Sequence, residues 1–153
     1  MKIGIISDTH GFLDPKVHEL FAGVEHILHA GDIGKASIIT ELETIAPVTA
    51  VIGNNDVGLN FKETEIVKLA VGKFVVHHIV LPYSPPDSIQ EIIERDCPAA
   101  VIFGHTHHAF CATIGRVLFV NPGYAGHPKF GIERKVAILH CDEYKIRPEF
   151  LSL

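Results

Sequence analysis

Short apolar runs alternate with helical patterns in the first third of the chain. The runs span residues 2–7, 27–30 and 48–52, and the first is apolar on both faces, as a strand in the middle of a covered sheet would be. Between the runs, residues 17–24 and 38–46 carry apolar side chains at the spacing of a helix. This β-α-β-α-β order predicts a parallel sheet with right-handed crossover connections.

The remaining two thirds of the chain contain more predicted strands than helices. Three pairs of runs have the pattern of hairpins, one further run has the pattern of a buried strand, and a short helix follows Ser84-Pro85-Pro86. The pairs are residues 64–71 with 74–77, 109–113 with 117–120, and 135–141 with 144–151, and the buried run is 99–103. No repeat or linker interrupts the 153 residues. We therefore expect one α/β domain over residues 1–153, with two mixed sheets face to face and helices outside.

The composition excludes two broad classes of protein. With 47% hydrophobic and 20% charged residues, the chain has the make-up of a globular protein rather than a disordered one. The net charge is -5, and the 13 Lys and Arg residues are scattered along the chain. This distribution argues against a nucleic-acid-binding protein that works through a basic surface.

The cysteines and the N-terminus bear on the cellular compartment. Cys97, Cys111 and Cys141 are odd in number and lack C-x-x-C spacing, so we predict neither a disulfide framework nor a zinc knuckle. The first apolar run is too short for a signal peptide, and no apolar stretch reaches the roughly 18 residues of a membrane-spanning helix. We expect a cytoplasmic protein without a membrane span. The sequence leaves open whether the chain forms a homo-oligomer.

Side chains of metal-ligating types follow the predicted strands. The carboxyl ends of parallel strands meet at one edge of an open sheet, so side chains placed just after them are expected to converge. Gly31, Gly53 and Gly104 precede three of these side chains and permit a sharp departure of the chain from its strand. The candidate ligands are Asp8, His10, Asp32, Asn54, His77, His105 and His107.

The donors in this set indicate the kind of metal. Two carboxylates, one amide and four imidazoles suit Mn, Fe, Co, Ni or Zn, and fit neither a cysteine zinc site nor an all-oxygen calcium site. Seven ligands are more than one ion with an open position needs. We therefore predict two ions with one carboxylate bridging them. With a bridging hydroxide such a centre carries a charge of about +1, which favours a phosphate ester as its ligand.

The order of these motifs resembles that of the calcineurin-like metallophosphoesterases. The short length and the sequence Asn121-Pro122-Gly123 resemble the small prokaryotic phosphodiesterase branch, which is related to the retromer subunit of eukaryotes. The resemblance covers residues 1–123 and implies a four-layer α/β/β/α sandwich. The motifs that carry it are Asp8-Thr9-His10, Gly31-Asp32, Gly53-Asn54-Asn55-Asp56, His77 and Gly104-His105-Thr106-His107.

The resemblance also implies a ligand set and a reaction. One ion would be held by Asp8, His10, Asp32 and His107, and the other by Asp32, Asn54, His77 and His105, so that Asp32 bridges the two. The implied protein is a metal-dependent phosphodiesterase acting on a small phosphoester, with a metal-bridging hydroxide as nucleophile. Manganese is the first expectation for the metal, with Fe, Ni, Co and Zn as alternatives.

Three residues depart from the family pattern. Asn55 stands where many relatives have His or Cys, His78 where Gly follows the histidine ligand, and Tyr124 where small relatives usually have Ser. None of these departures removes a ligand. Separately, His29 lies between apolar neighbours and is expected to be a hydrogen-bonded core histidine.

Two other functions remain open at the level of sequence. The chain could be a non-catalytic scaffold with the same fold, like the retromer subunit, whose metal site is degraded. The intact His10 and His107 argue against that alternative. A regulatory nucleotide- or metal-binding module is the other alternative.

Overall fold

A computed structural model describes residues 1–143 and 145–153. Its first sheet has the strand order β10-β9-β1-β2-β3. Strands β1, β2 and β3 run parallel, which confirms the predicted β-α-β-α-β unit, and β9 and β10 are antiparallel to their neighbours. The elements of this half are β1 (Lys2–Ile6), α1 (Lys16–Leu20), β2 (His26–His29), α2 (Ala36–Leu42), β3 (Val48–Ala50), β9 (Lys135–Cys141) and β10 (Ile146–Ser152). Tyr144, where the last predicted strand begins, lies outside the described residues.

The second sheet has the strand order β4-β5-β6-β8-β7. Its three central strands β5, β6 and β8 are parallel, and β4 and β7 pair antiparallel at the two edges. The predicted hairpins and the helix after Pro86 are confirmed. The elements are β4 (Thr64–Leu69), β5 (Gly72–His77), α3 (Asp87–Asp96), β6 (Ala100–Ile102), β7 (Phe110–Ile114) and β8 (Val117–Asn121).

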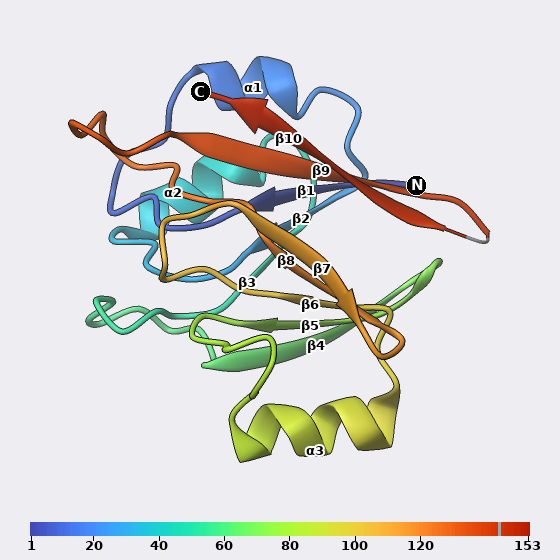
Figure 1. The fold of residues 1–153 in the computed structure, drawn as a ribbon. Helices are drawn as coiled ribbons and strands as arrows, with labels where there is room; N and C mark the ends of the chain where they lie inside the picture. The colour runs from blue at the N-terminus through green and yellow to red at the C-terminus, as the bar shows by residue number, and fades with distance from the viewer. Residues whose placement is uncertain (144) are drawn as a thin grey trace.

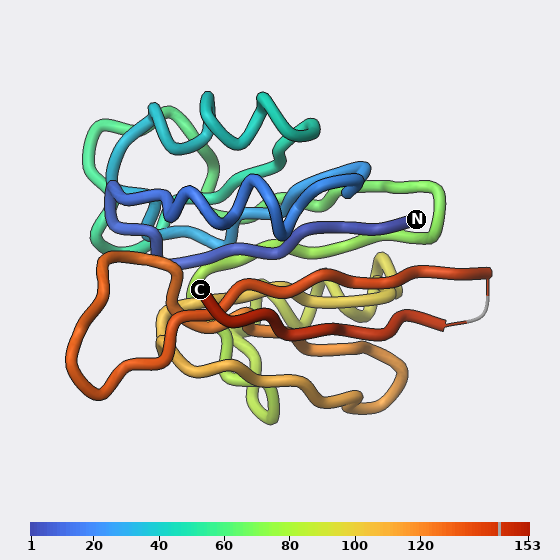
Figure 2. Tube along the Cα trace, turned by 90° about the horizontal axis from the view of Figure 1, so that it is seen from above, coloured from blue at the N-terminus to red at the C-terminus, as the bar shows by residue number. Residues whose placement is uncertain are grey.

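The two sheets pack face to face between helices, in the four layers that the resemblance implied (Figure 1). Three apolar clusters fill the three spaces between layers. One lies between α1, α2 and the first sheet and includes Val17 and Leu42; the next lies between the sheets and includes Ile5 and Phe74. The third packs Ile89 of α3 against the second sheet. Seen from above, the β9–β10 hairpin runs beside β1 (Figure 2).

Helices α1 and α2 are shorter than their sequence patterns predicted. After α1 the chain continues in a turn in which the Val24 N–H donates to the Phe21 carbonyl at 3.1 Å, and after α2 the Ile45 N–H donates to the Leu42 carbonyl at 2.9 Å. The apolar side chains of these turns still pack against the first cluster. Apolar spacing therefore continued past the point at which regular helix ended.

Helix α1 lies very close to the first sheet because β1 has a glycine beneath it. A Cβ atom at Gly4 would lie 2.9 Å from the ring of Phe21, so any larger residue would push the helix outward. Strands β1, β2 and β3 of the first sheet and β5 and β6 of the second all end on one side of the molecule, at the left of Figure 1. Within residues 1–143 and 145–153, no helix has the length and apolar character needed to cross a membrane.

Candidate metal centre

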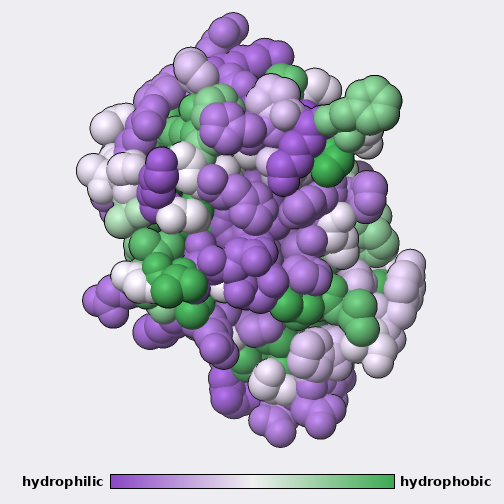
Figure 3. All heavy atoms as spheres, turned by 90° about the vertical axis from the view of Figure 1, so that its left-hand side faces the viewer, coloured by the Kyte–Doolittle hydropathy of each residue, from purple (hydrophilic) through white to green (hydrophobic). Residues whose placement is uncertain are grey.

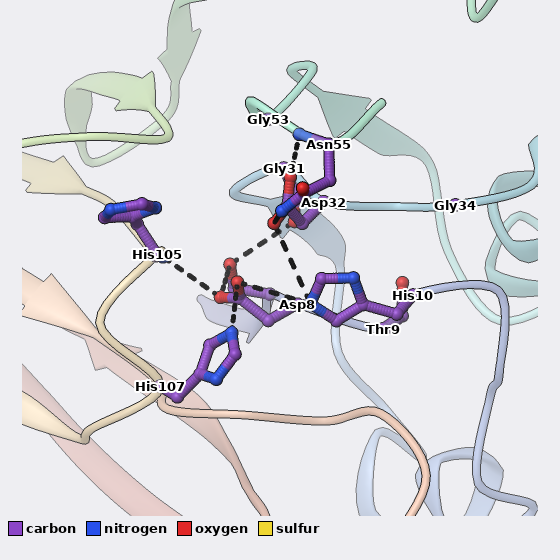
Figure 4. A network of polar contacts seen from close by, with 12 residues as sticks. Asp8, Thr9, His10, Gly31, Asp32, Gly34, Gly53, Asn55, His105 and His107 are labelled. Atoms are coloured by element: carbon purple, nitrogen blue, oxygen red, sulfur yellow. Dashed lines mark hydrogen bonds and ion pairs between the residues drawn. The ribbon is translucent and has the colours of Figure 1, made fainter. Parts of the chain in front are cut away.

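Asp8, His10 and His107 form a first cluster where β1 and β6 end (Figure 4). The Oδ1 atom of Asp8 lies 3.3 Å from Nε2 of His107 and 4.0 Å from Nε2 of His10. Its other oxygen, Oδ2, accepts hydrogen bonds from the Ser7 hydroxyl at 2.6 Å and from the backbone N–H of His105 at 3.2 Å. One face of the carboxylate is therefore fixed by the protein, and the other faces two imidazoles.

Asp32 follows β2 and faces two histidines, the predicted ligand His10 and the unpredicted His78. Its Oδ2 atom lies 3.8 Å from Nε2 of His10 and 3.5 Å from Nε2 of His78. Asn55 holds the carboxylate from the opposite side, because its backbone N–H donates to Oδ1 at 2.9 Å and its side-chain amide to Oδ2 at 2.7 Å. Asp32 therefore lies between two imidazole nitrogens, in an orientation that Asn55 fixes.

The proton on His78 can be assigned from its contacts. Nδ1 lies 2.7 Å from the carbonyl oxygen of Ala30, and a carbonyl can only accept, so Nδ1 carries the proton and donates. In the neutral ring, Nε2 then presents a lone pair toward Asp32. A backbone carbonyl that fixes the far nitrogen of an imidazole is a common support for a metal ligand.

Three buried atoms at this site lack a hydrogen-bond partner among the described residues. They are Asp8 Oδ1, His10 Nε2 and His78 Nε2. Buried polar atoms are seldom left unpaired, because desolvation without a new partner destabilises the folded state. A lone pair of neutral His78 facing a carboxylate of Asp32 is repulsive unless a proton or a metal ion lies between them. The oxygen and imidazole donors therefore fit divalent transition-metal ions.

Six of the seven predicted ligands lie at this centre, and His77 lines a neighbouring pocket together with Asn54 and His78. Asn54 and His105 contact each other through Oδ1 and Nδ1 at 3.0 Å, and the His105 ring lies edge-on to His78 with centroids 5.4 Å apart. His77 instead turns toward β4, where its Nδ1 contacts the Glu63 carbonyl at 2.9 Å. His78, which the sequence analysis counted as a departure, is the histidine whose Nε2 lies 3.5 Å from Asp32.

The reason lies in the two-residue period of strand β5. Phe74 and Val76 point between the sheets, whereas Val75 points toward α3. Residue 78 lies two positions after Val76, so it shares the face of Phe74 and Val76 and points toward the first sheet, where Asp32 lies. His77 lies two positions after Val75 and shares the opposite face.

Five predicted ligands share an uncommon backbone conformation. Among the described residues, six that are not glycine have positive φ, and the only one outside the ligand set is Cys97. Such residues are rare, and their concentration is typical of functional sites that the surrounding structure holds in place. The ligands concerned are Asp8 (φ 56°), His10 (46°), Asp32 (53°), His105 (70°) and His107 (61°).

Two glycines and one aspartate support the ligand loops. A side chain at Gly53 would collide with the carboxylate of Asp32, and one at Gly104 with Ser7 and Asp8. Asp56 accepts backbone N–H groups from two loops, from residues 33 and 34 at 3.0 and 2.8 Å and from Gly53 at 2.9 Å. The sequence analysis quoted Asp56 within a motif but missed this role.

His29 links the loops after β1 and β2 as a neutral side chain. The Gly31 N–H donates to its Nδ1 at 3.2 Å, so the proton lies on Nε2, which donates to the Thr9 hydroxyl at 2.9 Å. Thr9 in turn donates to the carbonyl of Ile33 at 3.0 Å. Burial lowers the pKa of His29 to about 3. The prediction of a hydrogen-bonded core histidine is confirmed.

The two carboxylates differ in their electrostatic surroundings. Burial raises the pKa of Asp8, against the opposing hydrogen bond from Ser7. Burial also acts to raise the pKa of Asp32, but the two hydrogen bonds from Asn55 outweigh it and hold that pKa below its usual value. A charged Asp8 in a buried position is stabilised by a nearby cation. Figure 3 shows this side of the molecule, where hydrophilic side chains gather at the centre and hydrophobic ones lie around them.

Comparison with known sequences identifies relatives over nearly the whole chain. Residues 1–144 match the family profile of the calcineurin-like phosphoesterase superfamily domain. A protein named as a probable metallophosphoesterase, from Methanothermobacter thermautotrophicus, is 34% identical over 99% of this chain and 92% of its own length. A phosphodiesterase of Methanocaldococcus jannaschii is 32% identical over 86% of this chain and 92% of its own.

Solved structures share the fold. The structure of an archaeal phosphodiesterase has a TM-score of 0.75 and 29% identity, and the match covers 99% of this chain and 100% of that one. Vps29 of Entamoeba histolytica in complex with zinc also has a TM-score of 0.75, at 21% identity, covering 99% of both chains. At that identity the second similarity concerns the fold alone.

Proposed function

Because this chain belongs to the calcineurin-like phosphoesterase superfamily, we propose that it is a phosphodiesterase working with two divalent transition-metal ions. The three buried, unpartnered atoms of Asp8, His10 and His78, all facing carboxylate or imidazole donors, are the observation that carries this proposal. Manganese is the first choice among the ions, and small phosphodiesters are the substrates. The phosphodiesterase names of two relatives support the choice of reaction.

Each ion has its own set of protein ligands in this proposal. Asp8, His10, Asp32 and His107 would hold the first ion. Asp32, Asn54, His78 and His105 would hold the second, with His78 in place of His77. Asp32 belongs to both sets because its Oδ2 lies within 4 Å of imidazole nitrogens from each, at 3.8 Å from His10 and 3.5 Å from His78.

The protein groups prepare the site for in-line attack on phosphorus. When bound, two divalent ions supply a hydroxide nucleophile near neutral pH and positive charge beside the phosphoryl oxygens. Ser7 and Asn55 orient the two carboxylates through hydrogen bonds of 2.6 Å and 2.7 Å. The Ala30 carbonyl keeps the proton of His78 on Nδ1 and leaves Nε2 free to ligate. Preorganised groups of this kind lower the barrier because they need no rearrangement during the reaction.

A non-catalytic scaffold is the second candidate, and the similarity in fold to Vps29 favours it. The side chains of this chain argue for the enzyme. His10 and His107 both face Asp8, so the site contains carboxylate and imidazole groups that can ligate a metal. A scaffold would not need the left-handed backbone that five ligands share.

Metal analysis combined with hydrolysis of bis(p-nitrophenyl) phosphate tests the function. We expect about two equivalents of bound Mn²⁺ per chain and turnover that requires it, on the two-ion premise. Treatment with excess EDTA should abolish turnover, and added Mn²⁺ should restore it. Full turnover by protein that retains no metal would contradict the proposal. Metal binding without turnover of any phosphodiester would favour the scaffold.

Adjacent histidines provide a matched pair for testing the ligand set. His78→Ala should weaken Mn²⁺ binding by about 100-fold or more, because it removes a ligand and leaves Asp32 without its neighbour. His77→Ala should change the affinity little, since that ring contacts Glu63 and Thr64 instead. Calorimetric titration of both variants with Mn²⁺ decides which of the two histidines is the ligand. A larger loss of Mn²⁺ affinity in His77→Ala than in His78→Ala would show that His77 is the ligand.

A further inference from the structure

Tyr124 packs directly against two of the candidate ligands. Its ring centroid lies 4.8 Å from that of His107 and 5.9 Å from that of His10. The side chain is almost fully buried, at 1% exposed. Gly126 makes room for it, because a Cβ atom at that position would collide with the tyrosine hydroxyl. The aromatic residue that departs from the family pattern therefore forms a wall of the site.

A lysine lies on this tyrosine. The Nζ atom of Lys129 is 5.0 Å from the centroid of the Tyr124 ring, within the range of a cation–π contact. Lys129 is exposed. No ion pair found among residues 1–143 and 145–153 includes it, so its charge is not neutralised by a carboxylate there.

The Lys129 ammonium group shares the Tyr124 ring with two candidate ligands, since that ring also packs against His107 and His10. An ammonium group has three N–H donors, and a cation–π contact on one side leaves donors available for an anion on the other. Tyr124 thus holds a cation with available donors at the rim of the site, one aromatic ring away from His107.

We propose that Lys129, held over Tyr124, binds a second phosphate of the substrate, carried on the alcohol next to the scissile phosphodiester. The inference rests on the proposed function, which places the scissile phosphate at Asp8 and Asp32. Lys129 forms no ion pair with either carboxylate among the described residues and contacts the ring that packs against His10 and His107, so a group outside the reacting phosphate is its expected partner. An ammonium group on a flexible stem is a common ligand of phosphate.

Two aryl esters that differ by one phosphate test this subsite. Thymidine 5′-(p-nitrophenyl phosphate) and its 3′-phosphorylated counterpart have the same leaving group. In the Mn²⁺-loaded wild-type protein at low ionic strength, the 3′-phosphate should lower KM about tenfold and leave kcat nearly unchanged, as for a charge-assisted contact made equally in ground and transition state.

Variants at two lysines assign the effect. Lys129→Met should make the KM values of the two esters equal, whereas Lys129→Arg should retain most of the difference. Lys68→Met removes the same charge from the exposed side of β4, beside the turn to β5 and far along the strand from His78, and should leave the difference intact. A wild-type protein with equal KM values for both esters would overturn the proposal, as would an unchanged ratio in Lys129→Met.

A binding measurement separates the subsite from the reaction. Thymidine 3′,5′-bisphosphate should bind the wild-type protein about tenfold more tightly than thymidine 5′-monophosphate in calorimetric titrations, and the two should bind alike to Lys129→Met. If neither ester is hydrolysed, the proposed function fails, but this ratio still decides on Lys129. Equal affinities in the wild-type protein, or no binding of either nucleotide, would show that Lys129 is not a phosphate ligand.

Discussion

Replacing Asp32 with alanine is expected to lower kcat/KM for a phosphodiester by about 10³-fold or more, because the change removes a charged ligand shared by both ions. Asp32 is buried at 2% exposure and faces His10 and His78 from a position that Asn55 fixes with two hydrogen bonds. Steady-state kinetics with bis(p-nitrophenyl) phosphate at saturating Mn²⁺ would measure the loss.

Asn54→Ala is the comparison for this prediction. Asn54 is exposed, carries no charge and makes one side-chain contact, to His105, so its loss should lower the rate by roughly 10- to 100-fold. Asp32→Asn controls for folding, since asparagine tolerates the left-handed backbone at this position better than most residues do. It should melt normally and still lack activity. If Asn54→Ala had a lower kcat/KM than Asp32→Ala, Asp32 would not be the bridging ligand.

The rate should also depend steeply on the leaving group. Asn55 stands where a histidine would be the proton donor in many relatives, and an amide has no proton that titrates near neutral pH. Its Nδ2 group already donates to Asp32 at 2.7 Å. Aryl phosphodiesters should therefore be cleaved about 10²- to 10⁴-fold faster than alkyl ones, the usual contribution of general acid catalysis.

A series of methyl phosphodiesters with aryl and alkyl leaving groups would measure this dependence as a slope of log kcat/KM against leaving-group pKa. Asn55→His should flatten the slope, chiefly by accelerating the poor leaving groups. Asn55→Ala provides the control, because it removes the hydrogen bond to Asp32 without adding a donor, and should be slower with an unchanged slope. A flat series in the wild-type protein would mean that another group, with the exposed His108 the first to test, donates the proton.

Most of the fold could be predicted from periodicity. The first parallel unit, the three hairpins and the helix after Pro86 all come from runs whose pattern is local. The strand order was not predicted, because β9 lies beside β1, which is far from it in the sequence. The ends of α1 and α2 could not be predicted, because apolar side chains such as Val24 and Ile45 continue to pack from hydrogen-bonded turns. Apolar spacing reports burial, and burial continues where regular helix stops.

The convergence of Asp8, His10, Asp32 and His107 was predicted, whereas the position of His78 was not. Phe74, Val75 and Val76 are all apolar because β5 is covered on both faces, by the other sheet and by α3. Such a run has no alternation that tells which face residue 77 or 78 will take. The roles of Asn55 and Asp56 depended on how two loops approach each other, which no local pattern records. The contact of Lys129 with Tyr124 could not be predicted for the same reason, since only the folded loop places the lysine over that ring.

The candidate ligands are drawn from both sheets, from Asp8 near the start of the chain to His107 after β6. During synthesis, a ribosome that has released the whole first β-α-β-α-β unit has presented Asp8, His10 and Asp32 but none of the histidines of the second sheet. In the proposed ligand sets, a complete site therefore forms only after the second sheet has docked on the first, in contrast to small zinc modules in which metal drives folding. For this protein, metal acquisition would be a late maturation step that reports a completed fold.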